Sequence, residues 1–249
     1  MEGPTADGGQ DPVAFWHAFA PAIETSASLE EAAGEFCARM YDACAAFAVL
    51  VRVFATVPYG RLDTGARRAA DAFAAMDRAG GIDPSTPVLA LLGTSGVEPD
   101  WRRRESSRDH GAIPLLSEEY VDGIPMVARL LGEIGFAAPV SRGDAWQFVS
   151  RDGADGSGLF FVGDARTATD DRGRPIIPAV GFVERYGVKS VFGFGGPTGG
   201  TDHVLTAIVF TRRTLLRADA MRYAPLLARF RSATAPLIAA GRVFRQPEP

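Results

Sequence analysis

The chain has 249 residues, of which 47 % are apolar, and this is enough to bury a full-sized hydrophobic core. A formal net charge of −4 gives no general electrostatic reason to bind nucleic acid or an anionic membrane, so neither is an expected partner. The sequence shows neither the pattern of a secretion signal nor an apolar span of about 20 residues, and the cytoplasm is therefore the expected compartment.

The beginning of the chain predicts a short lead followed by a helix. Residues 1–10 have no periodic apolar pattern and are expected to be disordered, with a single domain over residues 11–249. Asp11 suits the capping position of a first helix and Pro12 suits its first turn.

A second helix is predicted to begin after Ser28, which forms a capping-box pattern with Glu31. Cys37 and Cys44 lie seven residues apart on one face of this helix, about 10 Å from each other, which is too far for a disulfide. We therefore expect both to be buried, reduced core residues. Together the two helices form an N-terminal helical layer.

The next elements predict the start of a sheet. Residues 47–57 form an apolar, β-branched run in which Arg52 is the only polar residue of the strand interior, and this is typical of a central strand. A helix over residues 64–79 and a second strand over residues 87–93 follow. Parallel pairing through a crossover and antiparallel pairing are both compatible with this order.

The middle of the chain begins with the most polar stretch, residues 98–110, which leads into a short strand over residues 112–115. Ser117 opens a helical region that Gly123 and Pro125 divide into two pieces.

Beyond it, the pattern predicts a strand over residues 158–162 between two glycine-rich loops, at 150–158 and 164–174. Residues 176–183 are expected to form another extended piece.

Near the end of the chain, residues 186–211 predict two strands joined by a glycine-rich turn. Because a strand rather than a helix follows the glycines at 193–196 and 199–200, we interpret them as turn residues and not as a phosphate-binding loop. A helix over residues 217–240 closes the chain. Its apolar stripe motivates the prediction of a homodimer through the terminal helices.

Five segments carry a resemblance to a known group. They are AVLVRVFATVPYGRL (48–62), VLALLGTSG (88–96), SRDHGAIPL (107–115), IPMVARLLGEIG (124–135) and YGVKSVFGFGG (186–196). They resemble a bacterial sensory-input domain that is similar to GAF domains and occurs ahead of PAS and histidine-kinase modules. The resemblance implies an α/β (α+β) fold with a central, mostly antiparallel sheet flanked by N- and C-terminal helices, and a role in signal transduction through binding of a small molecule. It supplies no defined ligand.

The polar stretch is the first candidate for ligand chemistry, because Trp101, Arg108 and His110 lie in it. Guanidinium groups bind carboxylates and phosphates, and a tryptophan can stack on a ring. The competing interpretation is a solvated loop whose arginines pair with neighbouring carboxylates, at Glu98, Asp100, Glu105 and Asp109.

In a GAF-like fold a ligand would lie between the sheet and the connecting loops. The residues expected there are Tyr59, His110, Pro114, Phe182, Tyr186 and Phe194. Their aromatic content suits a flat or apolar ligand, although aromatic residues on strands also simply pack.

Two other classes of function stay open. One is a stand-alone enzyme or cofactor-binding protein that uses His110 and Arg108. In it, His110 would serve either as a single ligand to haem iron or in a reaction with Ser107 and Asp109, which are adjacent to it in sequence. The other is an interaction module without a ligand. A zinc site with several histidines is not expected, because the three histidines lack a metal-binding spacing.

Overall fold

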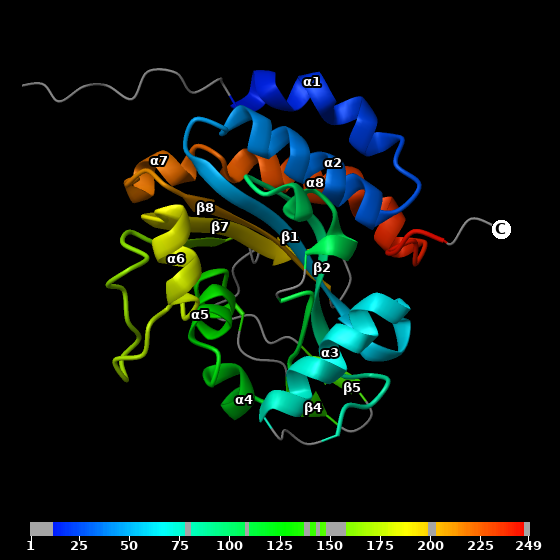
Figure 1. Ribbon diagram of the computed structural model, residues 1–249. Coiled ribbons are helices and arrows are strands. Elements are labelled where there is room, and N and C mark those ends of the chain that lie inside the picture. Colours follow the sequence, from blue (N-terminus) through cyan, green and yellow to red (C-terminus); the bar gives the residue numbers. More distant parts are fainter. Residues whose placement is uncertain are drawn as a thin grey trace, which may run out of the picture.

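The computed structural model describes residues 12–77, 81–107, 110–136, 140–142, 145–147, 158–198 and 203–246. Its centre is a six-stranded sheet with the strand order β3-β2-β1-β8-β7-β6, in which all neighbouring strands are antiparallel (Figure 1). The strands are β1 (Ala48–Pro58), β2 (Pro87–Gly96), β3 (Ala112–Pro114), β6 (Gly158–Val162), β7 (Ser190–Pro197) and β8 (Val204–Thr211). The open question of how the first two strands pair is thereby answered, since β1 and β2 are antiparallel.

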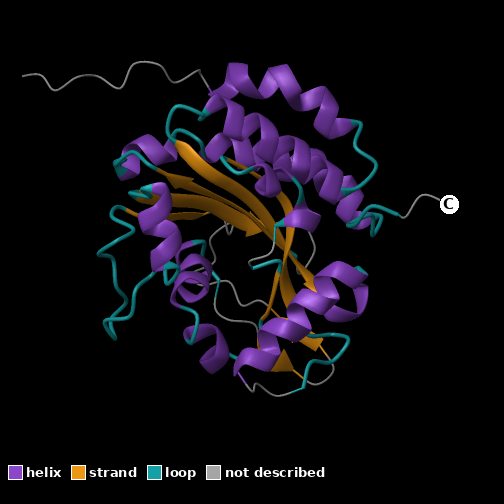
Figure 2. Ribbon diagram, in the orientation of Figure 1, coloured by secondary structure: helices purple, strands orange, loops and turns teal. Residues whose placement is uncertain are grey.

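Helices α2 (Leu29–Ala43) and α8 (Ala224–Ala239) cover one face of this sheet, and α1 (Pro12–Glu24) packs on the outer side of both (Figures 1 and 2). The predicted cap of α2 is confirmed, because Ser28 Oγ accepts a hydrogen bond of 3.2 Å from the backbone N–H of Glu31. The Glu31 carboxylate accepts a hydrogen bond from the backbone N–H of Ala27. These contacts fix the start of the helix whose apolar face packs on β1 and β2.

The helix predicted over residues 217–240 is divided into α7 (Arg217–Met221) and α8, with Pro225 in the first turn of α8. The apolar stripe of α8 lies inside the chain, where its Phe230 ring packs 4.7 Å from the ring of Phe36 on α2. The stripe is therefore covered by α1, α2 and the sheet, and it does not need a second copy of the chain to bury it.

Helices α5 (Pro125–Glu133) and α6 (Val180–Tyr186) lie on the opposite face of the sheet, with α4 (Glu118–Asp122) just before α5 (Figure 1). Helix α3 (Thr64–Asp77) packs against β2 and β3. The break between α4 and α5 occurs at Gly123 and Ile124, as the sequence predicted.

Strand β1 separates two hydrophobic cores because its side chains alternate between the faces. Val51, Val53 and Ala55 point toward α2 and its neighbours, whereas Leu50 and Phe54 point to the face of α5 and α6. Arg52 shares the face of Leu50 and Phe54. The one charged residue of this strand therefore projects from the centre of the sheet into the second layer.

The extended piece predicted over residues 176–183 is wrong in its second half, where α6 begins at Val180. Pro178 precedes the helix, and Phe182 and Tyr186 have the i, i+4 spacing of one helical face. Gly187, with φ of +62°, ends the helix in the left-handed conformation. Consequently β7 begins at Ser190 and not at Tyr186.

The glycines at 193–196, interpreted as turn residues, lie within β7. Gly195 pairs with Gly158 on β6, and a Cβ at Gly158 would lie 2.2 Å from the carbonyl oxygen of Glu133 on α5. The missing side chains let α5 lie directly on these two strands. The sequence also did not predict the separate two-stranded pair β4 (Val140–Arg142) and β5 (Ala145–Gln147).

Cys37 and Cys44 are both buried free thiols, as expected. Burial raises the pKa of Cys44 to about 11 and also raises the pKa of Cys37, so both thiols stay protonated at neutral pH.

Several sequence predictions lie outside the described residues, namely the disordered lead 1–10, most of the loop 150–158, and Gly199 and Gly200. Within the described ranges, no helix combines the length and the apolar character needed to cross a bilayer.

Candidate ligand cavity

A cavity of about 130 Å³ lies between the sheet, α5, α6 and the loop that follows β2. Two of its lining residues, Arg52 and His110, carry titratable groups. The other lining residues are apolar or aromatic: Leu50, Phe54, Leu89, Trp101, Ile113, Ile124, Met126, Val127, Leu130, Ile177, Pro178, Ala179, Phe182, Ile208 and Phe210. An apolar cavity with few polar groups is the usual form of a small-molecule site.

Arg52 is the buried polar group of this cavity. Its side chain rises from the central strand β1 and the residue is only 7 % exposed. Its Nη2 donates a hydrogen bond of 2.8 Å to Ser107 Oγ, at the end of the loop that follows β2. Because burying a cation costs several kcal/mol unless polar groups compensate for the lost water, the hydrogen bond to Ser107 contributes to keeping this arginine buried.

His110 lies at the exposed rim of the cavity and packs near Phe73 of α3, with 6.3 Å between the ring centroids. Its backbone φ is +58°, in the left-handed region that residues other than glycine adopt rarely, although histidine does so more often than most. The turn at His110 leads into strand β3, whose Ile113 lines the cavity.

An aromatic wall closes the side of the cavity between α6 and the loop. The Trp101 ring lies edge-on to Tyr186, with 4.7 Å between centroids, and 5.7 Å from Phe182. Phe182 in turn packs against Phe210 of β8 at 5.3 Å. The Tyr186 hydroxyl donates a 2.8 Å hydrogen bond to Glu98, which joins α6 to the loop after β2.

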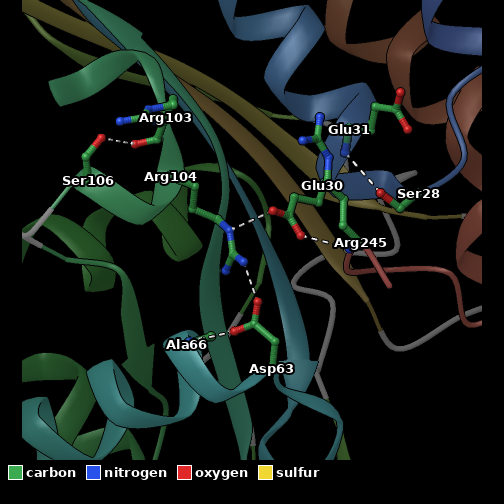
Figure 3. Close-up of polar contacts among 9 residues, drawn as sticks. All are labelled: Ser28, Glu30, Glu31, Asp63, Ala66, Arg103, Arg104, Ser106 and Arg245. Atoms are coloured by element: carbon green, nitrogen blue, oxygen red, sulfur yellow. Dashed lines mark hydrogen bonds and ion pairs between the residues drawn. The ribbon is translucent and has the colours of Figure 1, made fainter. Parts of the chain in front are cut away.

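The loop after β2 is held from its other side by Arg104 (Figure 3). Arg104 Nε donates a 3.1 Å hydrogen bond to Glu30 on α2, and its Nη2 donates to the carboxylate of Asp63 before α3. Glu30 also accepts a 2.9 Å hydrogen bond from the backbone N–H of Arg245. Arg104 thus pairs with carboxylates from distant parts of the chain and not, as one interpretation predicted, with those of its own loop.

Burial by itself would raise the pKa of Asp63. Hydrogen bonds from Arg104 and from the backbone N–H of Ala66, together with the charge of Arg104, outweigh that effect and hold the pKa below its usual value. The cluster is therefore charged at neutral pH, and it connects α2, α3, the cavity loop and the C-terminal segment.

Of the residues predicted to bind a ligand, the structure places Trp101, His110 and Phe182 on the cavity wall. Tyr186 lies behind them in contact with Trp101. Arg108 lies outside the described residues, as does Asp109.

Three predicted residues lie elsewhere. Tyr59 follows β1 at the far end of the strand, where its hydroxyl donates to Asp71 of α3. Pro114 is buried on the edge strand β3, but its neighbour Ile113 has the orientation that reaches the cavity. Phe194 points to the opposite face of β7, toward α8, because side chains alternate along a strand.

Arg52 is the polar residue of the cavity that the site prediction missed. The signal was present in the sequence, since Arg52 is the only charged residue in an otherwise apolar central strand. A charge in a buried strand implies either a structural partner or a ligand, and this reasoning would have found it.

Among the residues that the structure describes, no group of three or more histidine, cysteine or acidic side chains is arranged to hold a metal ion.

No family model matches the sequence, and no curated protein matches it. Among solved structures, the GAF domain of an Acinetobacter phosphoenolpyruvate-protein phosphotransferase matches with 14 % identity and a TM-score of 0.46, covering 94 % of this chain and 99 % of that one. The phycoerythrobilin-bound GAF domain of a cyanobacterial phytochrome matches with 12 % identity and a TM-score of 0.43, covering 92 % of this chain and 97 % of that one. The predicted fold class is confirmed by the antiparallel sheet with helices from both ends of the chain on one face.

Proposed function

We propose that residues 11–249 form a sensory or regulatory domain that binds a small molecule in the cavity lined by Arg52, Trp101 and Phe182. The observation that carries this proposal is a cavity whose walls are apolar and aromatic except for Arg52 and His110. Apolar walls with a few polar groups that orient the bound molecule are the usual lining of a small-molecule site. Free, buried thiols suit a reducing compartment such as the cytoplasm.

The experiment is a ligand screen on the full chain by thermal unfolding, accompanied by native mass spectrometry of freshly purified protein. A molecule that binds only the folded state raises Tm in proportion to the logarithm of its concentration above Kd. We expect small apolar and aromatic compounds to raise Tm, or a retained ligand to appear as added mass.

Two matched variants localise the effect. Ala179 lines the mouth of the cavity and is exposed, so Ala179→Trp should fill the entrance without disturbing the core. Ala46 is exposed in the turn between α2 and β1, and Ala46→Trp serves as the control. Ligand-induced shifts should disappear in Ala179→Trp and persist in Ala46→Trp. Equal shifts in both variants, or no shift and no added mass with any compound, would overturn the proposal.

The homodimer through the terminal helices stays a separate prediction. The burial of the α8 stripe within the chain removes the reason first given for it. Size-exclusion chromatography with light scattering at high concentration decides between a monomer and a dimer.

A further inference from the structure

The walls of the cavity favour an uncharged ligand. The sheet contributes the apolar side chains of Leu50, Phe54, Leu89, Ile113 and Ile208, and the lining residues of α5 are all apolar. A charged group that moves from water to such walls loses its hydration and gains no hydrogen bonds in return. The body of a ligand in contact with these side chains is therefore uncharged.

The two titratable residues of the lining, Arg52 and His110, both have interaction partners within the chain. Arg52 Nη2 donates a hydrogen bond of 2.8 Å to Ser107 Oγ. His110 lies at the exposed rim, beside the ring of Phe73. None of the described lining residues carries a carboxylate that could pair with an ammonium group. The protein itself thus compensates Arg52, and the presence of this arginine does not call for an anionic ligand.

The volume of the cavity limits the ligand to about one ring. The cavity measures about 130 Å³. An apolar cavity of roughly 150 Å³ stays free of water and binds one benzene molecule. A single ring with one small substituent fits a space of this size, whereas a polycyclic molecule would extend through the mouth.

Aromatic side chains form much of the lining, namely Phe54, Trp101, Phe182 and Phe210. Trp101 lies on the sheet where Gly96 has no side chain, because a Cβ at Gly96 would be 2.8 Å from Trp101 Cε3. The rings of Phe182 and Tyr186 contact the indole from α6. Aromatic rings gain energy from edge-to-face or offset packing beyond the area they bury, so this wall favours an aromatic ring over a saturated one.

We infer that the cavity binds an uncharged molecule with a single aromatic ring, and that Trp101 determines the preference for an aromatic over a saturated ring. This inference rests on the proposed function. It adds the charge, the size and the aromatic character of the ligand, together with the residue that selects the aromatic ring.

Isothermal titration calorimetry of the full chain tests the charge of the ligand. Acetophenone and benzoate have nearly the same shape but differ in charge, and ethylbenzene and benzylamine form a second pair in which the charged group is a cation. We expect the uncharged member of each pair to bind about tenfold or more tightly, because the charged member loses hydration that the apolar walls do not replace.

The same measurement tests the aromatic preference. Cyclohexyl methyl ketone has the substituent of acetophenone on a saturated ring, and we expect it to bind about three- to tenfold more weakly than acetophenone. Trp101→Leu should remove most of this difference, and Trp101→Phe should retain it. Trp16→Leu is the matched control, since Trp16 on α1 is 5 % exposed and lies across the sheet from the cavity. Should Trp101→Leu not fold, Trp101→Met provides a second side chain without a ring.

The outcomes separate this inference from the proposed function. Benzoate or benzylamine that binds as tightly as its uncharged counterpart overturns the charge assignment. A preference for acetophenone that persists without a ring at position 101 overturns the role of Trp101. In both cases, a ligand that Ala179→Trp excludes leaves the proposed function standing. Failure of all these compounds to bind overturns the inference, whereas the proposed function fails only if the wider screen also finds no ligand.

Discussion

His110 combines a strained backbone with a place at the cavity rim. Its φ of +58° lies in a region that costs a β-branched residue about 1–2 kcal/mol, whereas asparagine and glycine tolerate it. The strain at His110 therefore comes from its backbone conformation and not from its imidazole. Variants that all lack the imidazole but differ in how well they tolerate a positive φ can measure the backbone strain.

We predict that His110→Val lowers the free energy of unfolding by about 1–2 kcal/mol relative to His110→Asn, which removes the imidazole equally. Urea unfolding followed by circular dichroism measures the difference. Equal stabilities of the two variants would contradict the prediction and mean that the turn relaxes to a negative φ.

For individual residues of the cavity, the sequence was partly informative. Trp101 and His110 were predicted from the polar stretch and Phe182 from the ligand position expected in a GAF-like fold, and all three line the cavity. Arg52 was not predicted as a site residue, because most arginines near the predicted site belong to the polar stretch, where charge is common. A single charge within an apolar strand is the stronger signal, since the burial that follows makes it costly.

Among the elements, α5 depends on glycines of the neighbouring strands. Gly158 and Gly195 are opposite each other on β6 and β7, and a Cβ at either position would meet atoms at the end of α5. At Gly158 the obstacle is backbone, the Glu133 carbonyl oxygen at 2.2 Å, which cannot rotate away. Because α5 is one wall of the cavity, its position also sets the cavity's shape.

We predict that Gly158→Ala lowers the free energy of unfolding by about 2–3 kcal/mol and weakens ligand binding, since α5 must move outward. Gly34→Ala is the control, because Gly34 lies within α2 with no atom within 4 Å of the added Cβ. That variant should be more stable by up to about 1 kcal/mol, the difference in helix propensity. A stable Gly158→Ala with unchanged binding would show that α5 is not held by this contact.

Long periodic elements were predictable from the sequence, and elements set by tertiary contacts were not. The stripes of α2 and α8 and the apolar run of β1 determine their own structure through burial. By contrast, α6 has only seven residues and follows a proline, and the glycines of β7 have the composition of a turn. The approach of α5 explains Gly195, and the Ala207 carbonyl oxygen of β8, which would lie 2.7 Å from an added Cβ, explains Gly193.

For the molecule as a whole, Arg104 connects segments that are far apart in the sequence. It pairs with Glu30, 74 residues away, and with Asp63, 41 residues away, and its guanidinium lies 5.2 Å over the ring of Phe244. Local spacing carries no information about such partners, and this is why the sequence could not predict the cluster.

The pKa of Asp63 makes part of the stability dependent on pH. Because the pKa is lower in the folded protein than the roughly 3.9 of an unfolded aspartate, its contribution is present above pH 4 and is lost as the pH falls through the folded value. We predict that Asp63→Asn lowers the free energy of unfolding by about 2 kcal/mol at pH 7. The difference between the two proteins should shrink as the pH falls from 5 toward 3. Denaturant unfolding at each pH measures it, and a difference that is independent of pH would contradict the assignment.

The arrangement of the layers has a practical consequence. The first and last described residues, Pro12 and Gln246, belong to the side of the sheet that α1, α2 and α8 cover, whereas the cavity is on the side of α5 and α6 (Figure 1). A surface tether or a fluorescent fusion that starts from Pro12 or Gln246 would therefore leave the fold across the sheet from the cavity. Attachment at these two positions is expected to leave the entry of a ligand unobstructed in binding measurements.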